Sequence, residues 1–168
     1  MSDPSSRNGD TAKISDIFRA PPDYPRWSGV ADLIHRSFDY MEALLGHPAR
    51  AMEVTSETLA EAASTGTAFL SEADGGSPIA CVFTRPSRDM PDALYLGWLA
   101  VAPSHRGRGL SHRLISIAET EASKAGFAAM TLDTGRALTD LHGLFGSAGF
   151  QIQSGDDDIV TFRKDLSS

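Results

Sequence analysis

The chain has 168 residues, of which 41% are hydrophobic and 22% charged, with 15 lysines and arginines against 22 aspartates and glutamates. This is the composition of an ordinary globular protein, and the length suits one domain with its own core. The formal net charge of −7 argues against a general nucleic-acid binder, and no apolar run approaches the roughly 20 residues of a membrane-spanning helix.

The first residues and the single cysteine bear on domain limits and location. The polar start MSDPSSRNGDTAK lacks the apolar core of a secretory signal, so we expect a disordered tail at 1–13 and a single domain at 14–168. Cys81 stands in the apolar run PIACVFT, which favours a small core residue over a nucleophile. One thiol cannot form an intramolecular disulfide, and this fits a reducing, cytoplasmic location.

Helical spacing and strand-like alternation divide the domain into about ten elements. In chain order, we predict a strand at 14–20, helices at 26–46 and 55–64, strands at 67–73, 78–84 and 93–101, a helix at 109–126, a strand at 127–134, a helix at 138–150 and a strand at 158–166. The first helix should bend after Phe38 and end at Gly46, and Thr55 or Ser56 should cap the second. A further short strand at 150–153 is an open alternative.

The order of these elements indicates the fold class. The sequence DGGS between the strands at 67–73 and 78–84 is a hairpin signal, so antiparallel pairing begins early. A strand, helix and strand follow at 93–134, which is a crossover between parallel neighbours. We therefore expect an α/β (α+β) domain with a mixed sheet and helices on both faces.

The segment VAPSHRGRGLSHRL at 101–114 gathers positive charge where a strand ends and a helix begins. The first turn of a helix presents N–H groups without intrahelical partners, and glycines at 107 and 109 allow a bulky anion to approach the main chain. With Arg106 and Arg108 beside them, these groups predict a phosphate or pyrophosphate site. The loop has no lysine for a nucleotide-hydrolase phosphate loop, and only two glycines of a dinucleotide fingerprint.

The same segment resembles the GCN5-related N-acetyltransferase (GNAT) superfamily. LAVAPSHRGRGLSHRLI follows the pattern L-x-V-x-P-x-x-R-G-x-G-x-[GA]-x-x-L, with Ser111 in place of glycine or alanine, and LFGSAGF at 144–150 is similar to L-Y-x-x-x-G-F. The resemblance covers nearly all of the chain beyond the tail. It implies a GNAT-like, mostly antiparallel sheet of six to seven strands with a splayed central strand pair, and acetyl-coenzyme A as the cofactor.

The resemblance also implies where that cofactor binds. Its pantetheine arm would pair with the main chain of the strand at 93–101, and its pyrophosphate would lie on the glycine loop. The residues expected to contact it are Leu99, Ala100, Val101, Arg106, Gly107, Arg108, Gly109, Leu110, Ser111, Thr134 and Phe145. Gly97 either marks the bulge of this strand or makes room for Trp98 or Trp27 to pack. No metal site is expected.

The implied reaction is direct attack of a neutral amine on the acetyl thioester, which makes the protein an N-acetyltransferase acting on a primary amine of a small molecule or protein. Two side chains usual in the family are missing. The strand at 93–101 offers Tyr95, Gly97 and Leu99 in place of a glutamate base, and Phe145 replaces the tyrosine that protonates the thiolate. A catalytically weak or inactive acyl-coenzyme A-binding module is therefore the alternative.

Other polar residues are then candidates for the missing roles. His142 stands one helical turn before Phe145, and Tyr95 lies on the central strand, so both are catalytic candidates. We expect the acceptor near His35, Asp39, Tyr40 and Asp133, although no motif identifies it. A homodimer is an expectation from the family only.

Overall fold

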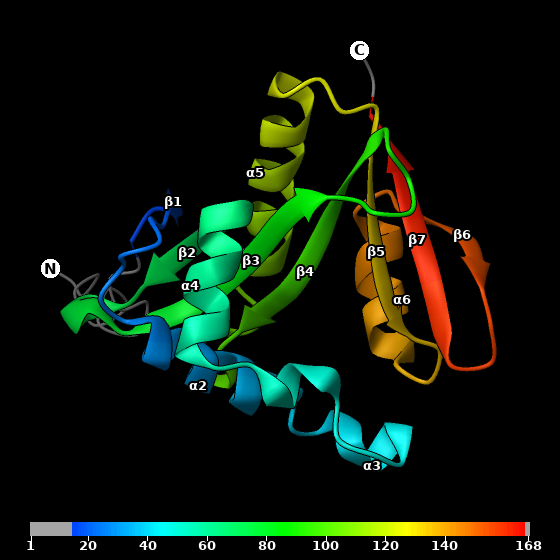
Figure 1. Ribbon diagram of the computed structural model, residues 1–168. Helices are drawn as coiled ribbons and strands as arrows, with labels where there is room; N and C mark the ends of the chain where they lie inside the picture. The colour runs from blue at the N-terminus through cyan, green and yellow to red at the C-terminus, as the bar shows by residue number, and fades with distance from the viewer. Residues whose placement is uncertain (1–14, 167–168) are drawn as a thin grey trace, which may run out of the picture.

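The computed structural model describes residues 15–166, so the expected tail at 1–13 lies outside the described residues. The elements in chain order (Figure 1) are β1 (Phe18–Arg19), α2 (Trp27–Phe38), α3 (Met41–Leu45), η1 (Arg50–Glu53), α4 (Ser56–Thr65), β2 (Thr67–Glu72), η2 (Asp74–Gly76), β3 (Pro78–Pro86), β4 (Ala93–Val101), η3 (Pro103–His105), α5 (Leu110–Lys124), β5 (Ala129–Gly135), α6 (Thr139–Ser147), β6 (Gln151–Gly155) and β7 (Ile159–Asp165). The strand expected at 14–20 is reduced to two residues, and the optional strand after 150 is formed.

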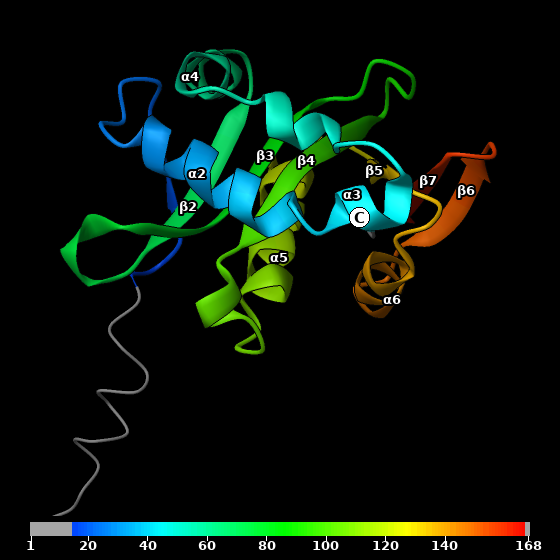
Figure 2. The same cartoon turned by 90° about the horizontal axis from the view of Figure 1, so that it is seen from below.

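The strands form one seven-stranded sheet in the order β1-β2-β3-β4-β5-β7-β6. Every neighbouring pair is antiparallel except β4 and β5, which are parallel and joined through α5. Figure 2 shows α4 on one side of the sheet and α5 and α6 on the other. The predicted mixed, mostly antiparallel sheet with helices on both faces is confirmed.

Local sequence signals account for several helix ends. Gly46 closes α3 in the left-handed conformation, with φ of 82°, after the chain bends at 39–40 as expected. The Thr55 hydroxyl accepts a hydrogen bond from the main-chain N–H of Thr58 at 3.2 Å, so Thr55 rather than Ser56 is the N-cap of α4. No helix within residues 15–166 is long and apolar enough to cross a membrane.

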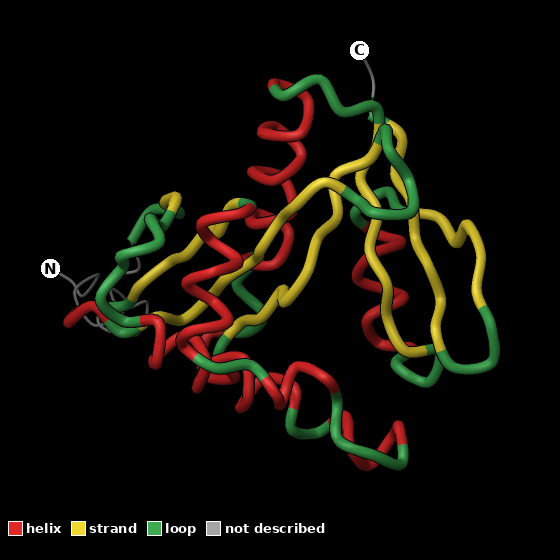
Figure 3. Tube along the Cα trace, viewed as in Figure 1, coloured by secondary structure: helices red, strands yellow, loops and turns green. Residues whose placement is uncertain are grey.

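The central strands β4 and β5 pair over a short distance and then diverge (Figure 3). Their three residue pairs end at Tyr95 and Thr131. The cause lies on the other edge of β4, where Gly97 pairs with Phe83 and Ala100 pairs with Cys81, so two residues of β4 oppose one of β3. Such a bulge bends its strand and increases the local twist, which turns β4 away from β5. The expected splay is therefore present.

The bulge falls at Trp98 and Leu99, one residue beyond the glycine at 97. Trp98 adopts a φ of 46°, and it is the one non-glycine residue with positive φ in the described chain. A Cβ at Gly97 would meet only the Tyr95 ring, at an ordinary contact distance of 3.4 Å. Gly97 therefore borders the bulge, and it makes room for neither Trp98 nor Trp27.

The core lies on both sides of this sheet. Side chains of α2 and α4 pack on β2, β3 and β4, and the buried stripe of α5 packs on the opposite face. Leu33, Leu70, Leu114 and Met130 are fully buried in it. Cys81 is also fully buried, as expected for a small core residue, and burial raises the pKa of its thiol.

Candidate functional site

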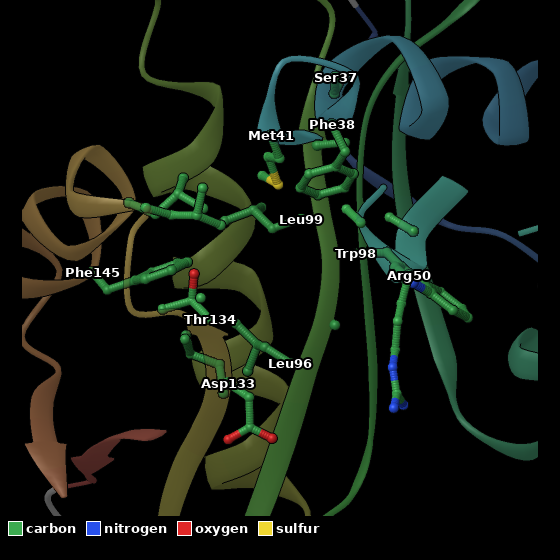
Figure 4. A pocket seen from close by; sticks show the side chains of 18 of the residues that line it. Ser37, Phe38, Met41, Arg50, Leu96, Trp98, Leu99, Asp133, Thr134 and Phe145 are labelled. Atoms are coloured by element: carbon green, nitrogen blue, oxygen red, sulfur yellow. The ribbon is translucent and has the colours of Figure 1, made fainter. Parts of the chain in front are cut away.

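A cleft of about 1250 Å³ opens where β4 and β5 diverge. Its walls come from the C-terminal end of α2, from α3, from the splayed strands, from the loop before α5 and from α6 (Figure 4). Nine of the eleven residues expected to contact the cofactor lie within 99–111, and all of these except Arg108 line the cleft. Thr134 and Phe145 also line the cleft.

The loop before α5 keeps the anion-binding features that its sequence suggests. Gly107 and Gly109 have φ values of 79° and 78°, and a Cβ at either position would meet nothing within 4 Å. Glycine is favoured at both positions because their backbone is left-handed, and not because a side chain would clash with a neighbour. Within residues 15–166 no side chain caps the N-terminus of α5, so the N–H groups of its first turn are open to an anion.

Arg106 joins this loop to the helix wall of the cleft. Its Nε lies 3.4 Å from the main-chain oxygen of Val101, and its Nη2 lies 3.4 Å from that of Ser37, at the C-terminal end of α2. The Ser37 hydroxyl donates to the same Val101 oxygen at 3.2 Å. The guanidinium is thus placed beside the cleft, where the partial negative charge of a helix C-terminus also favours it.

The β5-facing edge of β4 is open along the cleft. In the described chain no residue of β5 pairs with β4 beyond Tyr95, so main-chain groups of 97–101 that point toward β5 have no strand partner. The bulge itself is held from the other side, because the Cys81 thiol donates to the main-chain oxygen of Trp98 at 3.2 Å. An extended ligand can therefore add to β4 as a further strand would.

Thr134 and Phe145 form the opposite wall. The Thr134 hydroxyl is buried and has no hydrogen-bond partner among the described residues. Figure 4 shows it pointing toward Phe145 inside the gap. Phe145 is 6% exposed and packs against Phe150 and Phe162, so this position offers an apolar surface and no proton donor. An unpartnered buried hydroxyl is costly, so the Thr134 hydroxyl is available to hydrogen-bond a water or a ligand in the cleft.

Tyr95 and Asp133 line the cleft on the other face of the sheet. The Tyr95 ring carries the Arg85 guanidinium at 4.2 Å, and the Asp133 carboxylate accepts a hydrogen bond from the Thr161 hydroxyl at 2.7 Å. Burial raises the pKa of the Tyr95 phenol, and so does the negative charge of Asp133, although Arg85 opposes them. The phenol therefore stays protonated at neutral pH and can donate a hydrogen bond.

The structure does not bring His142 into the cleft. Its Nε2 lies 3.1 Å from the main-chain oxygen of Gly135, which only accepts, so the ring donates to the end of β5. The ring also packs edge-on against Phe162, with centroids 5.5 Å apart. A spacing of three residues rotates a side chain by about 60° around the helix, and this turns His142 toward β5 and β7 while Phe145 faces the gap. His142 is thus bonded to the end of β5 and is not among the residues that line the cleft.

Three further expected residues lie outside the lining. His35 bonds through Nε2 to the main-chain oxygen of Val54 at 2.9 Å, which fastens α2 to the segment after η1. Asp39 and Arg108 do not line the cleft either, although Tyr40 does. The helix bend at 39–40 separates Asp39 from Tyr40, because Asp39 ends α2 and Tyr40 precedes α3.

The cleft contains other residues that sequence reasoning did not select. They come from separate helices, loops and strands: Phe38, Met41, Arg50, Arg85, Arg88 and Trp98. Only Trp98 carried a signal, since it follows the glycine of the strand expected to bulge. Within residues 15–166 no three histidine, cysteine or acidic side chains are placed to hold a metal ion.

Residues 27–150 match the model of the Acetyltransferase (GNAT) family. The chain belongs to this family. No protein with a curated description matches the chain significantly. Solved GNAT folds do: the PaiA N-acetyltransferase of Thermoplasma acidophilum, in complex with coenzyme A, superposes with a TM-score of 0.76 at 15% identity over 91% of this chain and 99% of its own.

Two other acetyltransferases show the same fold. The ribosomal-protein-S18-alanine N-acetyltransferase of Escherichia coli has a TM-score of 0.68 at 17% identity, covering 91% of this GNAT chain and 96% of its own. A putative streptothricin acetyltransferase of Bacillus anthracis, in complex with acetyl coenzyme A, has a TM-score of 0.55 at 14% identity, covering 61% and 64%. At these identities the similarity is one of fold.

Proposed function

We propose that this GNAT protein is an N-acetyltransferase that transfers the acetyl group of acetyl-coenzyme A to a primary amine. The observation that carries the proposal is the gap between β4 and β5, which runs from an open strand edge to the uncapped N-terminus of α5. A ligand with an extended amide arm and a pyrophosphate matches both ends of this gap. The coenzyme complexes of the two similar folds support the same ligand.

The residues present fit this cofactor. Gly107 and Gly109 leave open space at the loop, and Arg106 adds a positive charge beside it. The main chain of Leu99, Ala100 and Val101 would hold the pantetheine arm. Thr134 offers the buried hydroxyl that lacks a partner among the described residues, and such a group is expected to face a polar atom of the ligand.

When bound, acetyl-coenzyme A supplies an acetyl thioester: the amine nitrogen bonds to the acetyl carbon as the C–S bond breaks, and the proton lost by nitrogen balances the released thiol. Asp133 would bind the incoming ammonium and take up its proton directly or through water. Tyr95 would orient the acceptor with its phenol. Main-chain N–H groups at the bulge would polarise the reacting carbonyl. Thr134 would donate a hydrogen bond in place of the tyrosine that Phe145 replaces.

A second function remains in competition because of Phe145. This side chain cannot donate a proton, and β4 carries no carboxylate at its bulge. A GNAT fold with these two changes would bind acyl-coenzyme A without efficient transfer. Both functions predict binding, so only turnover separates them.

Two measurements test the proposal. Calorimetry with acetyl-coenzyme A should show binding in the micromolar to millimolar range, and the absence of binding at these concentrations would refute both functions. Release of free thiol from acetyl-coenzyme A should then rise when a primary amine is added. Binding without amine-dependent thiol release would favour the catalytically weak module.

A further inference from the structure

A side pocket of about 380 Å³ lies next to the cleft, past Tyr95. Arg85, Arg88, Tyr95 and Asp133 line both the cleft and this pocket, so the two spaces adjoin each other. The remaining lining is mostly polar: Ser87, Asp89, Met90, Thr131, Ser154 and Thr161. Hydroxyl, guanidinium and carboxylate groups of this kind recognise a polar molecule rather than an acyl chain.

Three arginines on one wall of the cleft lack acidic partners. Arg50 of η1, Arg85 of β3 and Arg88 of the following loop form no ion pair within residues 15–166. By contrast, Arg163 on β7 contacts both Asp92 and Asp165 at 2.8 Å. In a chain with net charge −7, unpaired arginines that meet at one cleft are the expected receptor for an anionic group.

Arg85 is the most firmly placed of the three. Its guanidinium stacks over the Tyr95 ring at 4.2 Å and donates one hydrogen bond, to the main-chain oxygen of Pro86 at 3.2 Å. Stacking fixes the plane of the guanidinium while its edge keeps N–H donors for a carboxylate. On this side Glu61 of α4 lines the cleft and Asp89 lines the side pocket, so the three arginines still exceed the acidic residues by one.

The opposite wall is acidic. Asp133 at the end of β5 and Asp157 and Asp158 of the β6–β7 turn line the cleft there. Asp133 accepts a hydrogen bond from Thr161 and forms no ion pair among the described residues. Figure 4 shows its carboxylate pointing away from Phe145 and Thr134. A carboxylate so placed suits a ligand ammonium.

The sheet sets the separation of the two charges. Arg85 pairs with Tyr95, and Tyr95 pairs with Thr131, so the three side chains share one face. Asp133 follows Thr131 by two residues and points to the same face. Two strand spacings put the backbones of Arg85 and Thr131 about 10 Å apart, and Asp133 lies about 7 Å further along a strand that diverges from β4. The backbones of Arg85 and Asp133 are therefore about 12 Å or more apart, a distance that the long arginine side chain and one small dipolar molecule can span.

We propose that the acetyl acceptor is a small amine that also carries a carboxylate, as in an amino acid, with its ammonium at Asp133 and its carboxylate at Arg85 and Arg88. This inference rests on the proposed function and adds the substrate class. A polyamine or an aminoglycoside would bring further positive charge toward the arginine wall and would leave the guanidinium groups unpaired. A carboxylate of a free amino acid satisfies them.

The test compares each L-amino acid with its own carboxamide, and both with spermidine, by thiol release from acetyl-coenzyme A. The carboxamide keeps the amine and the side chain but removes the negative charge. For the best acceptor, kcat/KM of the acid should exceed that of the amide by roughly tenfold or more, as expected for lost charged hydrogen bonds. Equal or faster turnover of the amide or of spermidine would overturn the zwitterion proposal and leave the proposed function standing.

Variants test whether the preference for the acid over its carboxamide arises at Arg85 and Arg88. Replacing both arginines, Arg85→Gln with Arg88→Gln, should raise KM for the acid roughly tenfold or more and bring the ratio of kcat/KM for acid and amide close to one. The matched control is Arg19→Gln on the far edge strand β1, which should change none of these values. An unchanged KM for the acid in the double variant would refute the assignment. Absence of thiol release with every amine would refute the proposed function itself.

Discussion

Thr134 and Phe145 show how single side chains define the gap between β4 and β5. Phe145 fills its wall with an apolar ring, and Thr134 adds a hydroxyl that has no partner among the described residues. Across the gap, the Cys81 thiol bonds to the main chain of Trp98, the residue with positive φ. Substitutions that remove only the Thr134 hydroxyl or the Cys81 thiol therefore test what each group does.

We predict that Thr134→Val weakens acetyl-coenzyme A binding while leaving the fold intact. Valine has the shape of threonine without the hydroxyl, so thermal unfolding should be unchanged or stabilised by about 1 kcal/mol because an unpaired buried polar group is removed. The dissociation constant from calorimetry should rise roughly fivefold or more, since a ligand hydrogen bond is lost. Unchanged affinity would show that the hydroxyl does not meet the ligand.

Cys81 is expected to act on turnover through the bulge. Cys81→Ala leaves the Trp98 carbonyl without its donor and should destabilise the protein by about 1–3 kcal/mol. It should also lower kcat more than it raises KM for the acceptor, because the open edge of β4 is displaced. Cys81→Ser, which keeps a donor, should restore part of kcat. Equal kcat values for the alanine and serine variants would show that the hydrogen bond does not position β4.

At the scale of elements, the loop before α5 and the bulged strand β4 form adjoining parts of the cleft wall, where we propose that the coenzyme binds. The loop contributes left-handed glycines and an uncapped helix end, whereas β4 contributes an open edge. Neither alone holds a ligand that combines a pyrophosphate and an extended arm. Their adjacency follows from Val101, which ends β4 and also accepts the bond from Arg106.

Gly109→Asp and Gly109→Asn form a matched pair for this loop. Both side chains tolerate φ near 78° better than most residues, and they differ by one negative charge. Calorimetry should show acetyl-coenzyme A binding to the aspartate variant roughly tenfold or more weaker than to the asparagine variant, because a carboxylate repels phosphate. Similar affinities would place the pyrophosphate elsewhere.

At the scale of the whole molecule, the sheet consists of two parts that meet at β4 and β5. Three residue pairs join them, and Asp92 before β4 adds an ion pair to Arg163 of β7, with atoms 2.8 Å apart. The hydrogen bond from Arg163 holds the pKa of the Asp92 carboxyl below its ordinary value. The short junction is what leaves the rest of the two strands free to open around a ligand.

We predict that Asp92→Asn lowers the free energy of unfolding at neutral pH and that this difference disappears in acid. A carboxyl with a lowered folded-state pKa stabilises the protein above its unfolded pKa, roughly pH 4, and loses that contribution as pH falls through the lower folded value. Urea unfolding of both proteins at pH 7 and at pH 3 measures the change. A difference that persists or grows at the lower pH would contradict the role of this ion pair.

Local signals in the sequence were sufficient to predict most elements and the glycine turn before α5. Gly46 and Thr55 mark helix ends through backbone conformation and capping, and these requirements are visible in a few consecutive residues. Gly107 and Gly109 indicated the turn before α5 in the same way, since a left-handed backbone favours glycine. The length of β1 was overestimated because a strand extends only as far as it pairs with its neighbour. In β1, only Phe18 and Arg19 pair with β2.

The side-chain roles required the tertiary structure. His142 and His35 stood at helical spacings compatible with the cleft, yet each bonds to a main-chain oxygen on a neighbouring segment. Arg85 and Asp133 are 48 positions apart in the chain, and only strand pairing through β4 places them on one face. The sequence by itself determined the family, the order of elements and the glycine turn before α5, because these depend on motifs and backbone conformations within a few consecutive residues. Which charged residues line the cleft together was decided by the tertiary structure, because they come close only when distant strands pair.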